Sequence, residues 1–144
     1  MVRQDVTFDP IDAYRRLVAQ NFDALDGQRP GAAVNLQSIV TRFKVGNHKI
    51  LFAGDMQFEK PQVGNDVIKS SIVDMRGAIA EDGPYSFVKL SHHGSDNSFS
   101  EAILQELGET ALYGICAGEH SEKHPNAAVL KVLNKHRDDI SWAR

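Results

Sequence analysis

Two adjacent histidines, His92 and His93, end an apolar stretch of the sequence and are followed at once by Gly94 and four polar residues. Imidazole rings bind metal ions and exchange protons near neutral pH, and a pair of them adds little to a hydrophobic core. A histidine pair at a strand end, beside Gly-Ser, therefore favours a ligand or acid/base site over a structural role. The polar residues that follow could bond backbone groups or hold a ring nitrogen in one tautomer.

Asp55 ends a second apolar stretch, "LFAG", in the same way. A carboxylate at the mouth of a buried strand is poorly solvated unless something pairs with it, and a metal cation is a suitable partner. The alternative is a turn in which the Asp55 side chain bonds its own backbone. These residues alone leave both interpretations open.

His124 lies just before Pro125, where we expect a helix to begin. The positive end of a helix disfavours imidazolium, so His124 should be a neutral imidazole that binds metal or makes one hydrogen bond. The same position would suit an anionic substrate group. We expect the other histidines, His48, His120 and His136, to be surface residues, and Cys116 to be a small core residue.

The elements that must position these residues follow from periodicity and turn residues. The sequence predicts a helix over 10–26, a loop over 26–33, a strand hairpin over 37–53 with its turn at 46–47, and a helix over 66–80. It then predicts strands at 85–91 and 110–118, a short helix capped by Ser98 and Glu101, a helix from Pro125 and a final strand in "DISWAR". The sequence stops inside that strand, which we interpret as a cut within an element.

This order predicts a layered α/β or α+β architecture. Because the carboxyl ends of parallel strands meet at one sheet edge, Asp55 should lie within about 10 Å of His92 or His93. If His92 is a ligand, alternation along the strand should turn His93 to the opposite side.

Composition narrows the class of protein. The chain has 144 residues, enough for one domain, and a net charge of −3, which gives no basic surface for nucleic acid. One cysteine excludes an internal disulfide, so we expect a reducing, cytoplasmic location. No apolar run is long enough for a membrane segment.

Taken together, "NLQS" (35–38), "LFAGD", "KLSHHGSDNS" and "KHP" in that order closely resemble the C-terminal half of the metallo-β-lactamase fold. The nearest branch is the soluble domain of DNA-uptake competence proteins of the ComEC type and their free-standing hydrolase relatives. The resemblance covers 34–144, as half of an αββα sandwich that is incomplete as given, and leaves 1–33 as an N-terminal helix and loop. It implies hydrolysis of phosphodiester (nucleic acid) or other ester bonds through a metal-bound hydroxide.

The resemblance also implies roles for single residues. Asp55 matches the aspartate that bridges two zinc or manganese ions, and the late histidine ligand matches His92 in preference to His93. His93 and His124 would then act in catalysis. Three further residues would shape the site: Asn35, Ser38 and Ser95.

One part of the family pattern is missing, because the sequence holds no His-x-His-x-Asp-His motif. A catalytic zinc needs three protein ligands, so the chain should bind metal weakly or not at all and be inactive alone. We expect its partner to be an N-terminal half that carries the motif, and one apolar surface to be exposed where that half packs. The alternatives are a non-catalytic interaction module on a degenerate half-fold and, with less support, a phospho-acceptor domain using Asp55.

Overall fold

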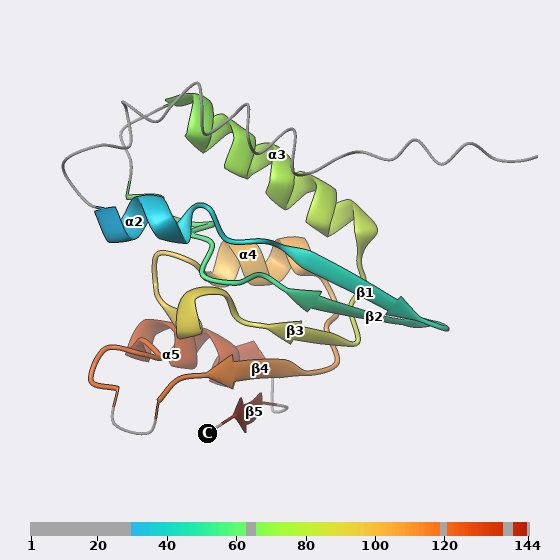
Figure 1. Cartoon of the computed structure of the whole chain (residues 1–144). Helices are drawn as coiled ribbons and strands as arrows, with labels where there is room; N and C mark the ends of the chain where they lie inside the picture. The colour runs from blue at the N-terminus through green and yellow to red at the C-terminus, as the bar shows by residue number, and fades with distance from the viewer. Residues whose placement is uncertain (1–29, 63–65, 119–120, 137–139, 144) are drawn as a thin grey trace, which may run out of the picture.

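The computed structural model describes residues 30–62, 66–118, 121–136 and 140–143, which form one mixed α/β layer structure (Figure 1). The predicted helix over 10–26 and His120 lie outside the described residues. The elements are α2 (Pro30–Asn35), β1 (Thr41–Val45), β2 (His48–Phe52), α3 (Asp66–Asp82), β3 (Phe87–Lys89), the 3-10 turn η1 (Ser91–Gly94), α4 (Glu101–Leu107), β4 (Tyr113–Cys116), α5 (Ala127–His136) and β5 (Ile140–Ala143).

A five-stranded sheet forms the centre of the structure, with the strands in the order β1-β2-β3-β4-β5. The predicted hairpin is confirmed: β1 and β2 are antiparallel, and Gly46 in the turn between them has a positive φ of 58°. β2, β3, β4 and β5 are parallel neighbours. The carboxyl ends of β2, β3 and β4 therefore lie at the same edge of the sheet.

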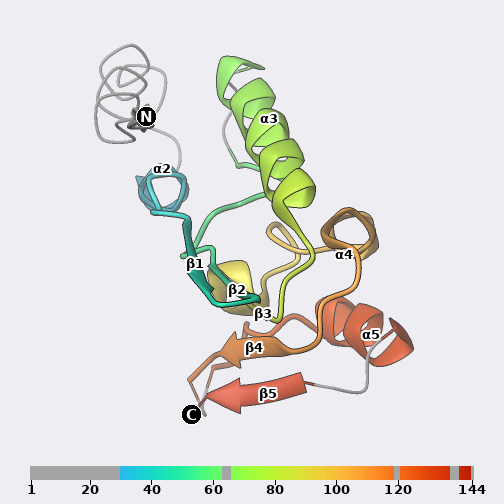
Figure 2. The ribbon, with the colours of Figure 1, turned by 90° about the vertical axis from the view of Figure 1, so that its right-hand side faces the viewer.

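Helices α3, α4 and α5 lie on one side of this sheet (Figure 2). Their apolar residues, such as Ile72, Leu107 and Leu133, join one buried cluster with Leu51, Val88, Tyr113 and Ile115 of the strands. Because side chains alternate along a strand, these four strand residues define the covered face. No helix among the described residues is long and apolar enough to cross a membrane.

The other face of the sheet carries large apolar side chains that remain exposed. Phe43 is 51% exposed, Val45 67% and Phe52 40%. The register places Phe43 beside Ile50 and Phe52 beside Lys89, so all lie on the face opposite Leu51. Phe43 and Phe52 make an edge-to-face contact, with ring centroids 5.8 Å apart, and Phe52 also contacts Phe87. The expected apolar surface is thus present, and we call it the open sheet face.

Three local predictions need correction. Residues 30–33 belong to helix α2, not to a loop, and β1 begins at Thr41 because residues 36–38 turn back onto α2 through backbone hydrogen bonds. The cap of α4 is Ser100, whose Oγ accepts a bond from the Ile103 backbone, while Ser98 is fully buried. Helix α5 begins at Ala127, where the Asn126 side chain accepts a bond from the Ala128 backbone at 2.8 Å.

Candidate functional site

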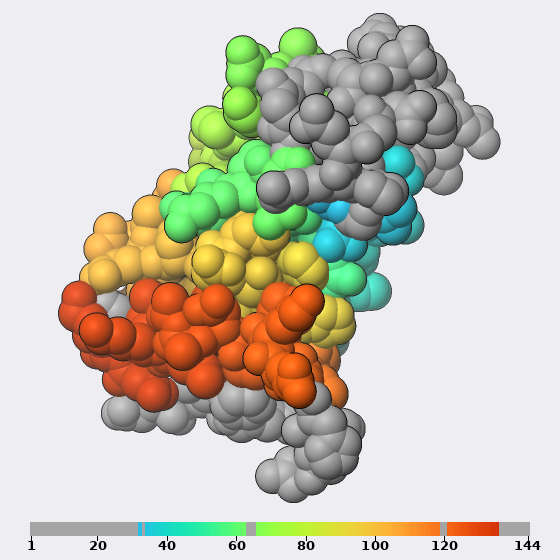
Figure 3. All heavy atoms as spheres, turned by 90° about the vertical axis from the view of Figure 1, so that its left-hand side faces the viewer, coloured from blue at the N-terminus to red at the C-terminus, as the bar shows by residue number. Residues whose placement is uncertain are grey.

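The loops that leave β2, β3 and β4 meet at one edge of the sheet. Figure 3 looks onto this edge, where the yellow residues that follow β3 lie between the green loop after β2 and the orange loop after β4. Asp55 follows β2, His92 and His93 follow β3, and His124 follows β4. The expectation that Asp55 lies close to the histidine pair is confirmed, because Asp55 Oδ1 is 3.6 Å from His93 Nε2.

His92 and His93 form a left-handed turn instead of continuing the strand. Their φ angles are 46° and 55°, a region that residues other than glycine seldom adopt, and Gly94 follows at 77°. The prediction that alternation would separate the two rings is wrong, because alternation applies only to extended backbone. The ring centroids are 6.3 Å apart, and both rings lie beside His124. Non-glycine residues held in this region concentrate at functional sites.

His93 is oriented from both sides of its ring. Its Nδ1 bonds the backbone carbonyl of Cys116, at the end of β4. A carbonyl only accepts, so Nδ1 carries a proton, and a ring with that one proton presents the Nε2 lone pair toward Asp55. A lone pair and a carboxylate oxygen that face each other at 3.6 Å repel unless a proton or a cation lies between them.

His92 is held differently, although it is the adjacent residue. Its Nε2 lies 3.1 Å from the side-chain nitrogen of Asn35 in α2, and its Nδ1 lies 3.1 Å from Asn97 Oδ1. Both ring nitrogens of His92 therefore have partners within the protein. Among the polar residues that the sequence offered for holding a ring nitrogen, Asn97 is the one that does so.

His124 packs its ring against the two histidines of the turn, with centroids 5.2 Å from His92 and 6.2 Å from His93. Its Nδ1 is buried and has no hydrogen-bond partner among the described residues. Burial lowers the pKa of His124 below its usual value, helped by the neighbouring His92 and His93 and by Lys123, while Asp55 acts in the opposite direction. A neutral imidazole was expected, but its main cause is burial and not the end of a helix.

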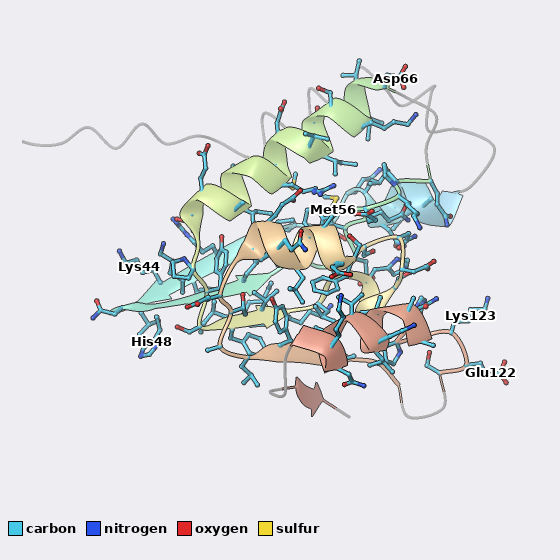
Figure 4. All side chains as sticks on the ribbon, turned by 180° about the vertical axis from the view of Figure 1, so that it is seen from behind. Lys44, His48, Met56, Asp66, Glu122 and Lys123 are labelled. Carbon is cyan, nitrogen blue, oxygen red and sulfur yellow. The ribbon has the colours of Figure 1, made fainter. Side chains whose placement is uncertain are left out.

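The loop that carries His124 presents its other side chains to solvent. Glu122 and Lys123 extend away from the protein (Figure 4). Gly94 lets this loop pack closely against the histidine turn, because a Cβ on Gly94 would lie only 3.0 Å from Pro125 Cβ. The Gly94 carbonyl also accepts a hydrogen bond from the Asn126 backbone at 2.9 Å. The histidine turn and the His124 loop therefore pack as one unit.

The remaining candidate residues support this edge. Ser38 Oγ accepts a bond from the Asp55 backbone at 2.9 Å, and a Cβ on Gly54 would lie only 2.8 Å from Ser38 Cβ. Ser95 is buried, and its backbone nitrogen closes the turn by bonding the His92 carbonyl. His48 is exposed near the hairpin tip, as predicted, and bonds Ser86 (Figure 4). Sequence patterns could not identify the Cys116 carbonyl, because a backbone group carries no residue signal.

Donors to a metal ion are present but few. Within the part of the chain that the structure describes, no group of three or more His, Cys, Asp or Glu side chains is arranged to hold an ion. Two ligands of a tetrahedral zinc at about 2.1 Å lie about 3.4 Å apart. The 3.6 Å between Asp55 Oδ1 and His93 Nε2 fits such a pair. The pair therefore fits a divalent ion, whereas a complete ligand set does not come from the described residues.

Comparison with known proteins gives one distant relation. The chain is 29% identical over 118 residues to ComE operon protein 3 of Bacillus subtilis (strain 168), a stretch that covers 80% of the chain. It covers only 13% of that protein, so the chain spans about an eighth of the length of its relative. This match supports the resemblance to competence proteins of the ComEC type and assigns no domain. No family model and no solved structure matches the chain.

Proposed function

We propose that the chain supplies one part of the catalytic site of a metal-dependent hydrolase of the metallo-β-lactamase type. The observation that carries the proposal is the lone pair of His93 Nε2 facing the Asp55 carboxylate at 3.6 Å, with His93 Nδ1 bonded to the Cys116 carbonyl. Metal-binding histidines commonly donate their other ring N–H to a carbonyl in this way. This geometry favours His93 over His92 as the histidine ligand, and we adopt His93 in the proposal.

A divalent ion held there would supply Lewis acidity toward a phosphoryl or carbonyl oxygen and would acidify water. The other ligands would come from a segment that carries His-x-His-x-Asp-His. The open sheet face, with Phe43 and Phe52 exposed, offers a surface on which such a segment can pack. Exposed apolar areas of this kind often mark interaction surfaces.

His124 is the acid/base residue in this proposal. Its ring lies next to His92 and His93 but outside the Asp55–His93 pair. Burial lowers the pKa of His124, so the ring is neutral at pH 7 and can accept a proton. Asn35 bonds the His92 ring and Ser38 bonds the Asp55 backbone, so these two residues hold the histidine turn and the Asp55 loop in position.

The test uses the polypeptide encoded by the complete reading frame. Metal content is measured by elemental analysis, and turnover is measured on single-stranded DNA as a phosphodiester substrate. Asp55→Ala should lose both. His124→Ala should keep its metal and lose rate by about 100- to 10,000-fold, as expected for a general acid or base. His48→Ala is the control, because His48 is exposed and, among the described residues, its side chain bonds Ser86 alone. Full activity in Asp55→Ala would overturn the proposal.

A second candidate is a non-catalytic interaction module built on this sheet. It is favoured by the lack of a third metal donor among the described residues. On this account the Asp55–His93 contact is an ion pair with a protonated ring, and the open sheet face is the functional surface. The two candidates separate in the experiment above, because the interaction module predicts neither metal nor turnover in the complete polypeptide.

A further inference from the structure

We infer that Asn97 is a positioning residue that holds His92 in the neutral tautomer with the proton on Nδ1. In this tautomer Nε2 of His92 accepts a hydrogen bond from the side chain of Asn35. The inference rests on the hydrogen bonds around one ring. Only its consequence, that His93 is the imidazole left to bind a cation, rests on the proposed function. The tautomer of His92 can be measured without metal or substrate.

The direction of each bond fixes the proton. Asn97 Oδ1 is an amide oxygen and can only accept, and Ser98 Oγ donates to it at 2.8 Å. His92 Nδ1, at 3.1 Å from the same oxygen, must therefore donate. A neutral imidazole has one N–H, so Nε2 of His92 carries the lone pair. That lone pair accepts from the side-chain nitrogen of Asn35 at 3.1 Å.

Asn97 is well placed to impose this choice. It is only 7% exposed, and Ser98, which bonds its side chain, is fully buried. The Asn97 backbone carbonyl accepts from the backbones of Glu59 and Lys60 at 3.0 and 2.9 Å, so its location does not depend on the histidine. In the other tautomer the Nδ1 lone pair of His92 would face the Asn97 oxygen and its Nε2–H would face the Asn35 N–H, so both hydrogen bonds would be lost.

The tautomer gives the two histidines of the turn different roles. His92 and His93 are both protonated on Nδ1, but their Nε2 atoms face different groups. His92 Nε2 faces the N–H of Asn35, which satisfies it, whereas His93 Nε2 faces a carboxylate that offers no donor. Asn97 and Asn35 thus engage His92 fully and leave His93 as the imidazole that is open to a cation.

The experiment is nitrogen-15 NMR of the histidine rings in the full chain, without added metal, at about pH 8. Two-bond proton–nitrogen correlations report which ring nitrogen carries the proton. We expect His92 to be protonated on Nδ1, the form that a free histidine disfavours. Asn97→Asp keeps the acceptor and should keep this tautomer. Asn97→Ala should shift His92 toward the Nε2–H form.

Two further variants complete the design. Asp96→Ala changes the exposed neighbour and should leave the His92 tautomer as it is. Asn35→Ala removes only the bond to Nε2, so the Nδ1–H tautomer should persist. An Nε2–H tautomer in the unaltered chain would overturn the inference even if Asn97→Ala failed to fold, and so would an unchanged tautomer in folded Asn97→Ala. A missing hydrolase activity with the Nδ1–H tautomer present would contradict the proposed function alone.

Discussion

His93 Nε2 lies 3.6 Å from Asp55 Oδ1, although the two residues follow different strands of the sheet. The parallel pairing of β2 with β3 brings them together, and the left-handed turn directs the His93 ring back toward Asp55. Their nearness is a product of topology and of two unusual backbone angles.

The chain on its own should bind divalent metal weakly. Asp55 and His93 offer two donors, and the described residues provide no group of three. Because a zinc site needs at least three protein ligands, calorimetric titration with zinc should give no tight, stoichiometric binding. A one-to-one complex of high affinity would contradict this, and loss of that complex in His93→Ala would locate it.

Gly94→Ala should destabilise the chain by about 1–3 kcal/mol, the usual cost of holding a side chain in a sparsely populated backbone region. Gly94 has a φ of 77°, and an added Cβ would lie 3.0 Å from Pro125 Cβ. Urea unfolding followed by circular dichroism measures the change in the free energy of unfolding.

Gly77→Ala is the matched control for that measurement. Gly77 lies inside α3 and would meet nothing within 4 Å. The same change there should stabilise the helix by about 0.5–1 kcal/mol. Equal effects at the two glycines would show that the turn places no special demand on residue 94.

The stability of the chain should fall below pH 7 in part because of His124. Burial lowers its pKa in the folded state, so as pH falls through about 6.5 the unfolded chain takes up a proton that the folded chain does not. Stability is then lost on acidification down to the folded pKa and is fully present above about pH 7. His124→Gln should reduce the difference in unfolding free energy between about pH 7.5 and pH 5.5. An unchanged difference would contradict the assignment.

The open sheet face should bind apolar probes. Phe43, 51% exposed, lies on the edge strand β1 and contacts Phe52 of β2 on this face. Phe43→Thr keeps a residue suited to strands and should lower both fluorescence of a bound naphthalene-sulfonate dye and self-association in sedimentation. Val73→Thr is the control, because Val73 is 62% exposed but lies on α3. If both variants behave alike, the sheet face is not the apolar binding surface.

The sequence predicted the hairpin and the order of elements that follow it, because apolar periodicity and Gly-containing turns are local signals. It predicted the gathering of Asp55 with the histidine pair because the carboxyl ends of parallel strands meet at one sheet edge. It could not predict that His92 and His93 adopt positive φ angles, since residues other than glycine rarely do so and the bonds that hold the turn, from the His92 backbone N–H to the Gly54 carbonyl and from His93 Nδ1 to the Cys116 carbonyl, are tertiary contacts. For the same reason alternation assigned the two rings to opposite sides.

The site partners were harder to foresee for a different reason. Asn35 reaches His92 Nε2 from helix α2, 57 residues away in the sequence, and the His93 partner is a backbone carbonyl at Cys116, whereas Asn97 was among the nearby polar residues that the sequence offered. Side-chain amides and carbonyl groups are common in loops and give no spacing pattern. The predicted cap of α4 was wrong for a related reason. Ser98 and Ser100 are both acceptable caps in the sequence, and the burial of Ser98 decides between them.

Comparing His93→Ala with His92→Ala in the polypeptide of the complete reading frame tests the central claim most directly. Both variants remove one imidazole from the same turn, so general damage to the turn affects both. Metal content by elemental analysis should fall in His93→Ala, which loses the lone pair that faces Asp55, and should be largely kept in His92→Ala, whose ring bonds Asn35 and Asn97. Loss of metal in His92→Ala with full metal content in His93→Ala would contradict the account.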